Sequence, residues 1–347
     1  MSPEQLQVSP STEGELRPDQ RGASLERVPA FSTERDFSGK ETVAFKFGGS
    51  SVNGADRLLH SAALVREAAQ FSSVTVVVSA MRGVTDRLLR IAQMLAEGRN
   101  GAARNEAEAV VELHQATLRD LKLERNEHER VAHELKLLSG DLVHEIPAHG
   151  RVQISDALFD RLASFGERFA ARLFAAALVV SGVPAVPVAS SDFVLTCDNF
   201  RDAKPHLEHT RRRGRQVLLP LLEAGIVPVV TGFIGATEDG RITTLGRNSS
   251  DFSGALIAHV VEAEELVIWT DVDGIYTANP RESTEAQLLH ELSYDEAHAL
   301  AASGAKVLHP HVLPLAAQTG MTVWVRNTFK PQVRGTRIGF QQTGGAA

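Results

Sequence analysis

The chain has 347 residues, 43% of them hydrophobic and 23% charged, which is typical of a globular protein with one large domain or two. Its net charge of −7, without a basic stripe beyond the run 211–213, argues against a nucleic-acid partner. The single cysteine, Cys197, excludes a disulfide framework, and no stretch approaches the ~18 apolar residues of a membrane span.

Residues 1–40 are polar and rich in proline, and they show no sustained periodicity. Such a segment buries too little apolar surface to offset its ordering entropy, so we expect a disordered N-terminal tail. The tail lacks the apolar core of a signal peptide, and its many acidic residues argue against an organellar transit peptide. We therefore expect a cytoplasmic protein without a membrane partner.

The first strand is predicted at Thr42–Phe47, followed by Gly48-Gly49-Ser50-Ser51 and a helix over about 56–69. The glycines allow backbone amides to turn inward as an anion nest, and Lys46 at the strand end can reach a transferring phosphoryl group. A Walker loop fits poorly, because its lysine follows the glycines whereas Lys46 precedes them. The alternative is a plain strand-to-helix turn with a solvated lysine.

The middle of the chain alternates strands and helices. The β-branched run Ser73–Ser79 predicts a buried strand, and residues 80–86 are expected to form the loop beyond it. Apolar residues at helical spacing predict helices within 102–142 and over 155–180. The remaining expected elements are strands at 183–188, 192–196 and 226–231, a helix at 206–223, and a hairpin with strands at 233–236 and 241–245.

Residues with useful chemistry concentrate between Leu245 and Arg281. Arg247 has a planar fork that suits a carboxylate, and Asp251 can hold an ammonium group. The backbone N–H groups of 248–250 open a helix and would point at an anion. The strand Glu265–Trp269 follows, and ligands collect outside the carboxyl ends of strands in an open α/β sheet. The pattern predicts a kinase for a small zwitterion.

The last part of the chain contains two further helices and a strand. Ser293 and Glu296 form a capping box at a helix start, and Gly304-Ala305-Lys306 is expected to end that helix. Pro310 is expected to begin the next helix, and Met321–Arg326 is predicted as the last strand.

Five stretches of this sequence resemble the catalytic domain of aspartate kinases, in the amino-acid kinase superfamily. They are, in the order of that family, Lys46–Val52, Ser79–Asp86, Ser164–Glu167, Leu245–Arg281 and Gly304–Pro310. The resemblance implies an α/β fold, a three-layer α/β/α sandwich with a mainly parallel central sheet. It also implies an aspartate-binding N-terminal lobe at 41–235, an ATP-binding C-terminal lobe at 236–340 and a tail at 341–347.

The resemblance implies roles for individual side chains. The implied catalytic residues are Lys46, Gly48, Gly49 and Asp251. The implied aspartate pocket contains Ser79, Thr85, Glu167, Phe233, Arg247 and Ser250. The implied nucleotide site contains Ser50, Thr270, Asp271, Tyr276, Arg281 and Lys306. In this assignment Arg247 holds the α-carboxylate of aspartate, and Glu167 with Asp251 holds the ammonium, although Asp251 facing the reacting centre is an open alternative.

The implied reaction transfers the γ-phosphoryl group of ATP to the side-chain carboxylate of L-aspartate, the entry step to lysine, threonine and methionine. That carboxylate has an unperturbed pKa near ~3.9 and is already ionised at neutral pH, so no general base is required. Alignment and charge neutralisation remain, with Mg²⁺ bridging the β- and γ-phosphates. No direct protein ligand is assigned to the metal.

Three features depart from the family pattern. Arg82 stands where a small residue is common, and Ser249 replaces a glycine, which would cost about 1 kcal/mol if that position requires a positive φ. The chain also stops at Ala347 without the paired ACT regulatory modules, so we expect either a naturally short kinase or the catalytic domain of a longer one. A homodimer, if formed, is expected to use the kinase domain.

Two rival functions stay open. One is a relative that acts on another carboxylate, such as N-acetylglutamate or glutamate. The other is a weakly active regulatory subunit that binds a full-length kinase.

Overall fold

The computed structural model describes residues 41–246, 249–278, 283, 285–302 and 308–340. In these residues an eight-stranded sheet has the order β10-β12-β11-β7-β1-β2-β4-β3, and every neighbouring pair is parallel except β11 and β12. The strands are β1 (Thr42–Phe47), β2 (Ser73–Val78), β3 (Ala185–Val188), β4 (Val227–Thr231), β7 (Glu265–Thr270), β10 (Glu291–Leu292), β11 (Thr322–Asn327) and β12 (Thr336–Ile338). The predicted mainly parallel sheet is confirmed.

The central strands consist of continuous apolar runs because both faces of the sheet are covered. In β2, all residues from Val74 to Val78 are buried, and β1 is buried from Val43 onward. β1 pairs with both β2 and β7, so the sheet runs without interruption across the expected lobe boundary at 235/236. The division into an aspartate lobe and an ATP lobe stays a prediction.

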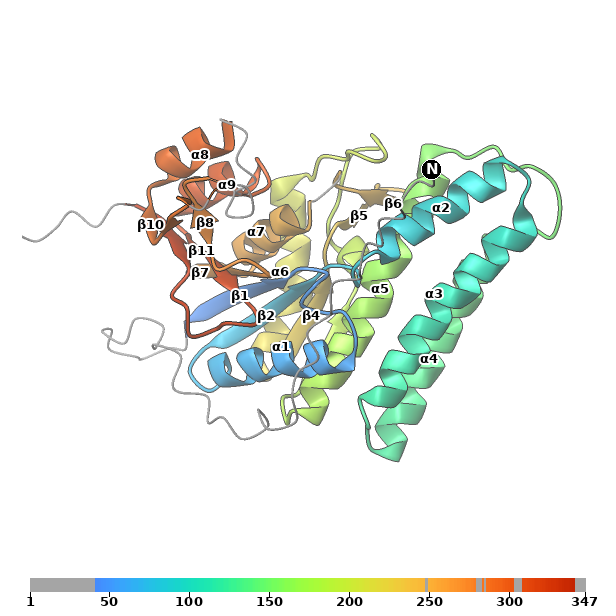
Figure 1. The fold of residues 1–347 in the computed structure, drawn as a ribbon, viewed down its shortest axis with the longest axis horizontal. Helices are drawn as coiled ribbons and strands as arrows, with labels where there is room; N and C mark the ends of the chain where they lie inside the picture. Colours follow the sequence, from blue (N-terminus) through green and yellow to red (C-terminus); the bar gives the residue numbers. More distant parts are fainter. Residues whose placement is uncertain (1–40, 247–248, 279–282, 284, 303–307, 341–347) are drawn as a thin grey trace, which may run out of the picture. The chain divides into compact units, whose positions relative to one another are not determined.

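Helices cover both faces of the sheet, which confirms the three-layer sandwich (Figure 1). One face carries α1 (Ala55–Ala68) and α5 (Asp156–Val180). The other face carries α6 (Leu207–Glu223), α7 (Ser250–Val260) and α9 (Val312–Thr319), with α8 (Tyr294–Ala302) packed on α9. None of the described helices combines the length and the apolar character that crossing a membrane requires.

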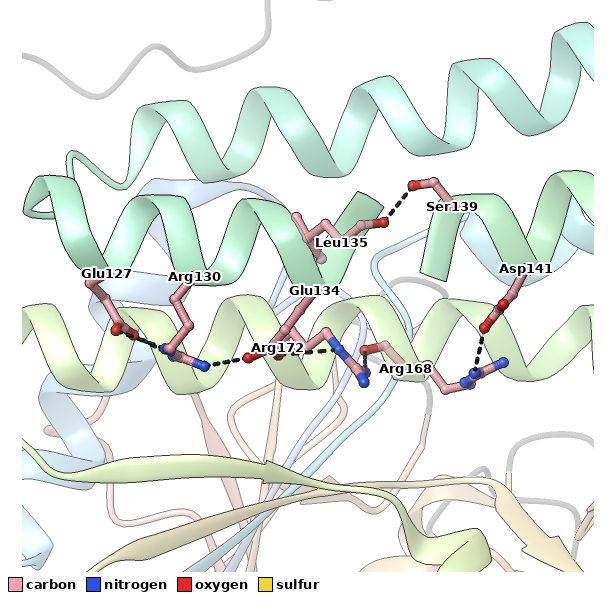
Figure 2. A network of polar contacts seen from close by, with 8 residues as sticks. All are labelled: Glu127, Arg130, Glu134, Leu135, Ser139, Asp141, Arg168 and Arg172. Carbon is pink, nitrogen blue, oxygen red and sulfur yellow. Dashed lines mark hydrogen bonds and ion pairs between the residues drawn. The ribbon is translucent and has the colours of Figure 1, made fainter. Parts of the chain in front are cut away.

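Three more helices pack on the outside of α5: α2 (Val84–Ala96), α3 (Asn100–Asp120) and α4 (Arg125–His144). Figure 2 shows the polar network between α4 and α5. Arg168 of α5 lies 3.5 Å from Asp141, and Arg172 lies 3.4 Å from Glu134, which also pairs with Arg130. Burial lowers the pKa of both α5 arginines, so these ion pairs compensate for their partial desolvation.

Most of the remaining predictions are confirmed, and two are wrong. The expected hairpin forms from β5 (Ile234–Ala236) and β6 (Ile242–Thr244), and a second antiparallel pair joins β8 (Ile275–Tyr276) to β9 (Leu288–Leu289). The expected strand at 192–196 forms no continuous strand, and only isolated bridges join Leu195 to Ala236 and Thr196 to Pro205. The chain instead forms a short 3₁₀ helix, Ser190–Asp192, because the hydroxyl of Ser190 bonds to Ile234 O and Thr231 and holds the backbone in a turn.

The second error concerns the segment 80–86, which was expected to be a loop throughout. α2 begins at Val84, directly after Gly83, whose φ of 78° lies in the left-handed region that glycine tolerates. Thr85 therefore lies in the first turn of a helix. The expected tails at 1–40 and 341–347 and the helix end at 304–306 lie outside the described residues.

Candidate active site

The candidate site lies where four neighbouring parallel strands end. β7, β1, β2 and β4 are adjacent in the sheet and parallel, so their carboxyl ends meet at one edge. The chain continues from these ends into Gly48–Ser51, Ser79–Gly83, Gly232–Phe233 and Asp271–Gly274. β1 is also the strand at which the sheet order turns, and such a switch point is the usual ligand site of an open α/β sheet.

Gly48–Ser51, the glycine loop, forms a tight turn that is closed by the Ser51 N–H donating to Gly48 O at 2.9 Å. The Gly48 N–H donates to Trp269 O at 3.1 Å, so this amide is already satisfied within the protein. The N–H groups of Gly49 and Ser50 have no bond to another described group. They are therefore the amides of this loop that can receive an anion.

Gly49 lies against the backbone of the loop that follows β2. A Cβ at this position would come within 2.7 Å of Ala80 O, and the Gly49 carbonyl accepts the Arg82 N–H at 3.2 Å. A side chain would therefore push the two loops apart. Gly49 is needed for close approach, and the expectation that this glycine matters has a steric basis.

Lys46 and Asp251 form an ion pair at the centre of the site. Phe47, next to Lys46 in β1, packs on Phe174 of α5, so by strand alternation Lys46 points to the opposite face, toward α7. There its Nζ lies 2.6 Å from Asp251 Oδ1. Gly254 makes room for it, because a Cβ there would lie 3.0 Å from the Cβ of Lys46.

This ion pair is closed on one side and open on the other. The side chain of Lys46 is only 8% exposed, whereas that of Asp251 is 23% exposed. Asp251 stands in the first turn of α7, where the helix dipole favours a negative charge. The arrangement places Lys46 beside the glycine loop, where its Nζ can interact with an incoming anion.

Glu167 is a buried carboxyl group on α5 with one oxygen left over. Its Oε1 accepts the Ala80 N–H at 3.0 Å, while Oε2 is buried and has no partner among the described residues. Burial raises the pKa of Glu167 to about 8, against the opposing effects of the Ala80 hydrogen bond and the charge of Lys46. An unpaired carboxylate oxygen of this kind fits an ammonium group, which would restore the ionised form.

The start of α7 carries the other predicted substrate contacts. Ser250 is the first residue of the helix, and Ser249 before it has φ −78°, so the expected backbone penalty of serine at 249 does not arise. The positive φ occurs at Gly246 instead, with 92°.

Phe233, in the loop after β4, has φ 68°, which is unusual for an aromatic residue, and its N–H donates to Ser253 Oγ at 2.7 Å. Such a held, strained residue is frequent at binding loops.

The predicted nucleotide residues are only partly brought to the same edge. Thr270 ends β7 and Asp271 is exposed directly after it, close to the glycine loop through the bond from Gly48 to Trp269. Tyr276 lies in β8, and no described contact joins it to Lys46. Arg247, Arg281 and Lys306 lie outside the described residues, so their predicted roles stay predictions.

The predicted pocket hydroxyls and Ser50 are placed near this edge. The Ser79 N–H donates to Phe47 O at 3.1 Å, which fixes the end of β2 to the end of β1. Thr85 is half-buried in the first turn of α2. The carbonyl of Ser50 accepts a bond from Arg57 Nη1 at 3.0 Å.

Asp160 of α5 fixes the strand that leads to the site, and the sequence did not predict this role. This buried carboxylate accepts the N–H groups of Arg201 and Thr244 at 2.8 Å each, and its Oδ1 accepts the Thr244 hydroxyl at 2.8 Å. It thereby holds β6, which leads into the start of α7. Its position about two turns before Glu167 on one helix face was the available signal.

The fold and the site together define an α/β protein with a glycine loop and an ion-paired lysine at the carboxyl ends of its parallel strands. The comparisons with known proteins agree. The chain belongs to the amino acid kinase family, whose model matches residues 41–327.

Several relatives are aspartokinases. The chain is 36% identical to lysine-sensitive aspartokinase 3 of Escherichia coli over 86% of this chain and 64% of that protein. It is 34% identical to chloroplastic aspartokinase 1 of Arabidopsis thaliana over 86% of this chain and 52% of that protein. A crystal structure of E. coli aspartokinase III in complex with aspartate and ADP matches with a TM-score of 0.76 and 34% identity, covering 88% of this chain and 66% of that one. The chain thus spans between about half and two thirds of the length of these relatives.

Proposed function

We propose that this chain is an aspartate kinase that converts L-aspartate and ATP to 4-phospho-L-aspartate and ADP. The observation that carries the proposal is the ion pair of Lys46 and Asp251, 2.6 Å apart, beside the glycine loop and near the Glu167 oxygen that has no partner among the described residues. The names of the relatives, and the aspartate and ADP bound in the E. coli aspartokinase III structure, support the same substrates. By extension, the reaction would be the first step toward lysine, threonine and methionine, in the cytoplasm.

The chemistry needs alignment and charge neutralisation. An oxygen of the aspartate side-chain carboxylate, already ionised at neutral pH, attacks the γ-phosphorus. The bond from that phosphorus to the bridging oxygen breaks, and ADP leaves with the electron pair. Lys46 and the free amides of Gly49 and Ser50 neutralise the charge on the equatorial oxygens. Asp251 orients Lys46 through the ion pair.

The substrate is held by groups of opposite charge. Glu167 receives the α-ammonium of aspartate, with Asp251 as its second carboxylate. Arg247 is assigned to the α-carboxylate, and Phe233, Ser79, Thr85 and Ser250 complete the pocket. Thr270, Asp271, Tyr276, Arg281 and Lys306 are assigned to the nucleotide.

Mg²⁺ fits this site as a companion of ATP. The described residues contain no cluster of three or more histidine, cysteine, aspartate or glutamate side chains suited to a metal. Mg²⁺ commonly keeps several waters and binds through phosphates and one or two carboxylates, and Asp251 and Asp271 stand at the right edge of the sheet for that. Bound there, the ion would neutralise the β- and γ-phosphates.

The proposal is tested by trapping the acyl phosphate with hydroxylamine and measuring ADP release with L-aspartate, L-glutamate and N-acetyl-L-glutamate. We expect turnover only with L-aspartate, and its loss in Lys46→Ala. Lys136→Ala is the control, because Lys136 is exposed on α4. Faster turnover with either glutamate substrate would reassign the acceptor. Absence of turnover, combined with stimulation of a full-length kinase, would make the chain a regulatory subunit, and gel filtration would show whether it forms a homodimer.

A further inference from the structure

Asn327–Lys330, which we call the connecting segment, joins the glycine loop to the end of β7. Thr328 is fully buried and is bonded on three sides. Its N–H donates to Thr270 O at 2.8 Å, its carbonyl lies 2.6 Å from His60 Nε2, and its Oγ1 lies 2.7 Å from Ser51 Oγ. Thr328 therefore contacts both the glycine loop, through Ser51, and the end of β7, through Thr270.

Ser51, the last residue of the glycine loop, anchors this loop to the rest of the protein. It is fully buried, and its N–H closes the turn by donating to Gly48 O. Its carbonyl accepts the Ser61 hydroxyl at 2.8 Å, so the backbone is fixed to α1. The hydroxyl bond to Thr328 then fixes the same residue to the far end of the sequence. These contacts fix the backbone of the glycine loop, and with it the positions of the free amides of Gly49 and Ser50.

The connecting segment also binds the loop that follows β7. The side-chain amide of Asn327 donates to Asp273, and Lys330 Nζ lies 3.2 Å from the other oxygen of that carboxylate. Phe329 is 37% exposed and lies under the guanidinium of Arg57, 4.6 Å from its ring centre. The segment thus sets the glycine loop and the loop 271–274 in one fixed relation.

We infer that Ser51 and Thr328 are positioning residues for the terminal phosphates of the nucleotide. Their hydroxyl bridge holds the glycine loop at a fixed distance from the strand end that carries Thr270 and Asp271. The inference rests on the proposed function, because it assigns the glycine loop to phosphate binding. A misplacement of about 1 Å at a reacting centre can cost ~10²-fold in rate, so a buried bridge behind the loop can govern catalysis without touching ligand.

Equilibrium binding separates positioning from plain stability. The variants are Thr328→Val, Thr328→Ser, Ser51→Ala and the double variant Ser51→Ala/Thr328→Val. Thr243→Val is the matched control, because it removes one hydroxyl of a second buried bridge, Thr243 to Thr196 at 2.7 Å, in the hairpin region. Calorimetry at constant Mg²⁺ measures the dissociation constants of AMP-PNP, a non-hydrolysable triphosphate, and of AMP, and thermal melting reports stability.

We expect Thr328→Val and Ser51→Ala each to weaken AMP-PNP by about tenfold, the worth of one lost hydrogen bond, while AMP binding stays within about twofold. Thr328→Ser should restore AMP-PNP binding. The double variant should bind AMP-PNP no more weakly than Thr328→Val, because the two hydroxyls act as a unit. Thr243→Val should lower the melting temperature and leave both nucleotide affinities unchanged.

Three results would overturn the inference. These are equal losses for AMP-PNP and AMP, an unchanged AMP-PNP affinity at a lowered melting temperature, and fully additive losses in the double variant. If Thr328→Val does not fold, Ser51→Ala removes the same bridge from the other side with a smaller change. If the wild-type protein binds no nucleotide, both the proposed function and the inference are refuted. A wild-type protein that binds AMP-PNP but does not phosphorylate aspartate would sink the substrate assignment alone.

Discussion

Glu167 is a buried carboxyl group whose replacement by glutamine should stabilise the free protein at alkaline pH. Burial raises its pKa from 4.5 to about 8. The unfolded chain therefore releases this proton near pH 4.5, whereas the folded protein keeps it until about pH 8, so the free energy of unfolding falls as pH rises through that window. At about 1.4 kcal/mol for each pKa unit, the loss reaches roughly 5 kcal/mol above pH 8.

Glutamine retains an oxygen that accepts the Ala80 N–H but carries no charge. We expect Glu167→Gln and wild type to have similar stability at pH 5, and the variant to be several kcal/mol more stable at pH 9, measured by urea denaturation. Glu265→Gln is the control, because burial also raises the pKa of Glu265, which lies at the amino end of β7, opposite the site. It should show a gain of the same sign while keeping full activity. A difference between Glu167→Gln and wild type that stays constant from pH 5 to 9 would refute this reasoning.

The same carboxyl group should give aspartate binding a proton signature. At neutral pH Glu167 is mostly protonated in the free protein, and the arriving ammonium group favours its ionised form, so binding should release up to one proton. Calorimetry in buffers of different ionisation enthalpy measures this number. Glu167→Gln should release none and should show a strongly raised aspartate KM.

Four further substitutions test the geometry of the site. Gly49→Ala should lower kcat by ~10²-fold in steady-state assays, because its Cβ would lie 2.7 Å from Ala80 O, whereas Gly48→Ala, with 3.6 Å to its nearest atom, should be milder. Asp160→Asn should cost about 1–3 kcal/mol in urea denaturation and raise the KM for aspartate but not for ATP, because an amide cannot accept from all three donors. Ser249→Gly should bring no gain in melting temperature and a loss of up to ~1 kcal/mol, because φ there is already negative.

The framework of the fold could be predicted because its signals are local. Buried parallel strands such as Ser73–Val78 are uninterrupted β-branched runs, and the capping box at Ser293 stands in the structure as two reciprocal bonds with Glu296. The expected strand at 192–196 failed for a non-local reason. Its residues have strand propensity, but the hydroxyl of Ser190 bonds to Thr231 and Ile234 O, and these partners are far away in sequence.

The site could be predicted in its residue types but not in its geometry. Lys46 and Asp251 were both singled out, yet their contact depends on α7 crossing the sheet over β1, which neither residue's own neighbourhood specifies. The commitment of the Gly48 amide to Trp269 likewise follows from the pairing of β1 with β7. Asp160 looked like an ordinary polar position on an amphipathic helix, because only the folded chain brings β6 against it.

Helix α5 carries two buried carboxyl groups that have opposite effects on the stability of the protein. Asp160 and Glu167 are both buried carboxyl groups with raised pKa values, and both project from this helix, whose outer arginines pair with α4 (Figure 2). Asp160 accepts three hydrogen bonds, which oppose the effect of burial on its pKa, and its replacement would leave a donor unpaired and destabilise the protein. Within the described residues Glu167 has a partner on one oxygen only, so its charge destabilises the free protein, and an arriving cation would satisfy it. The number of donors around each carboxylate therefore predicts opposite signs for Asp160→Asn and Glu167→Gln at pH 9, although the two residues share one helix.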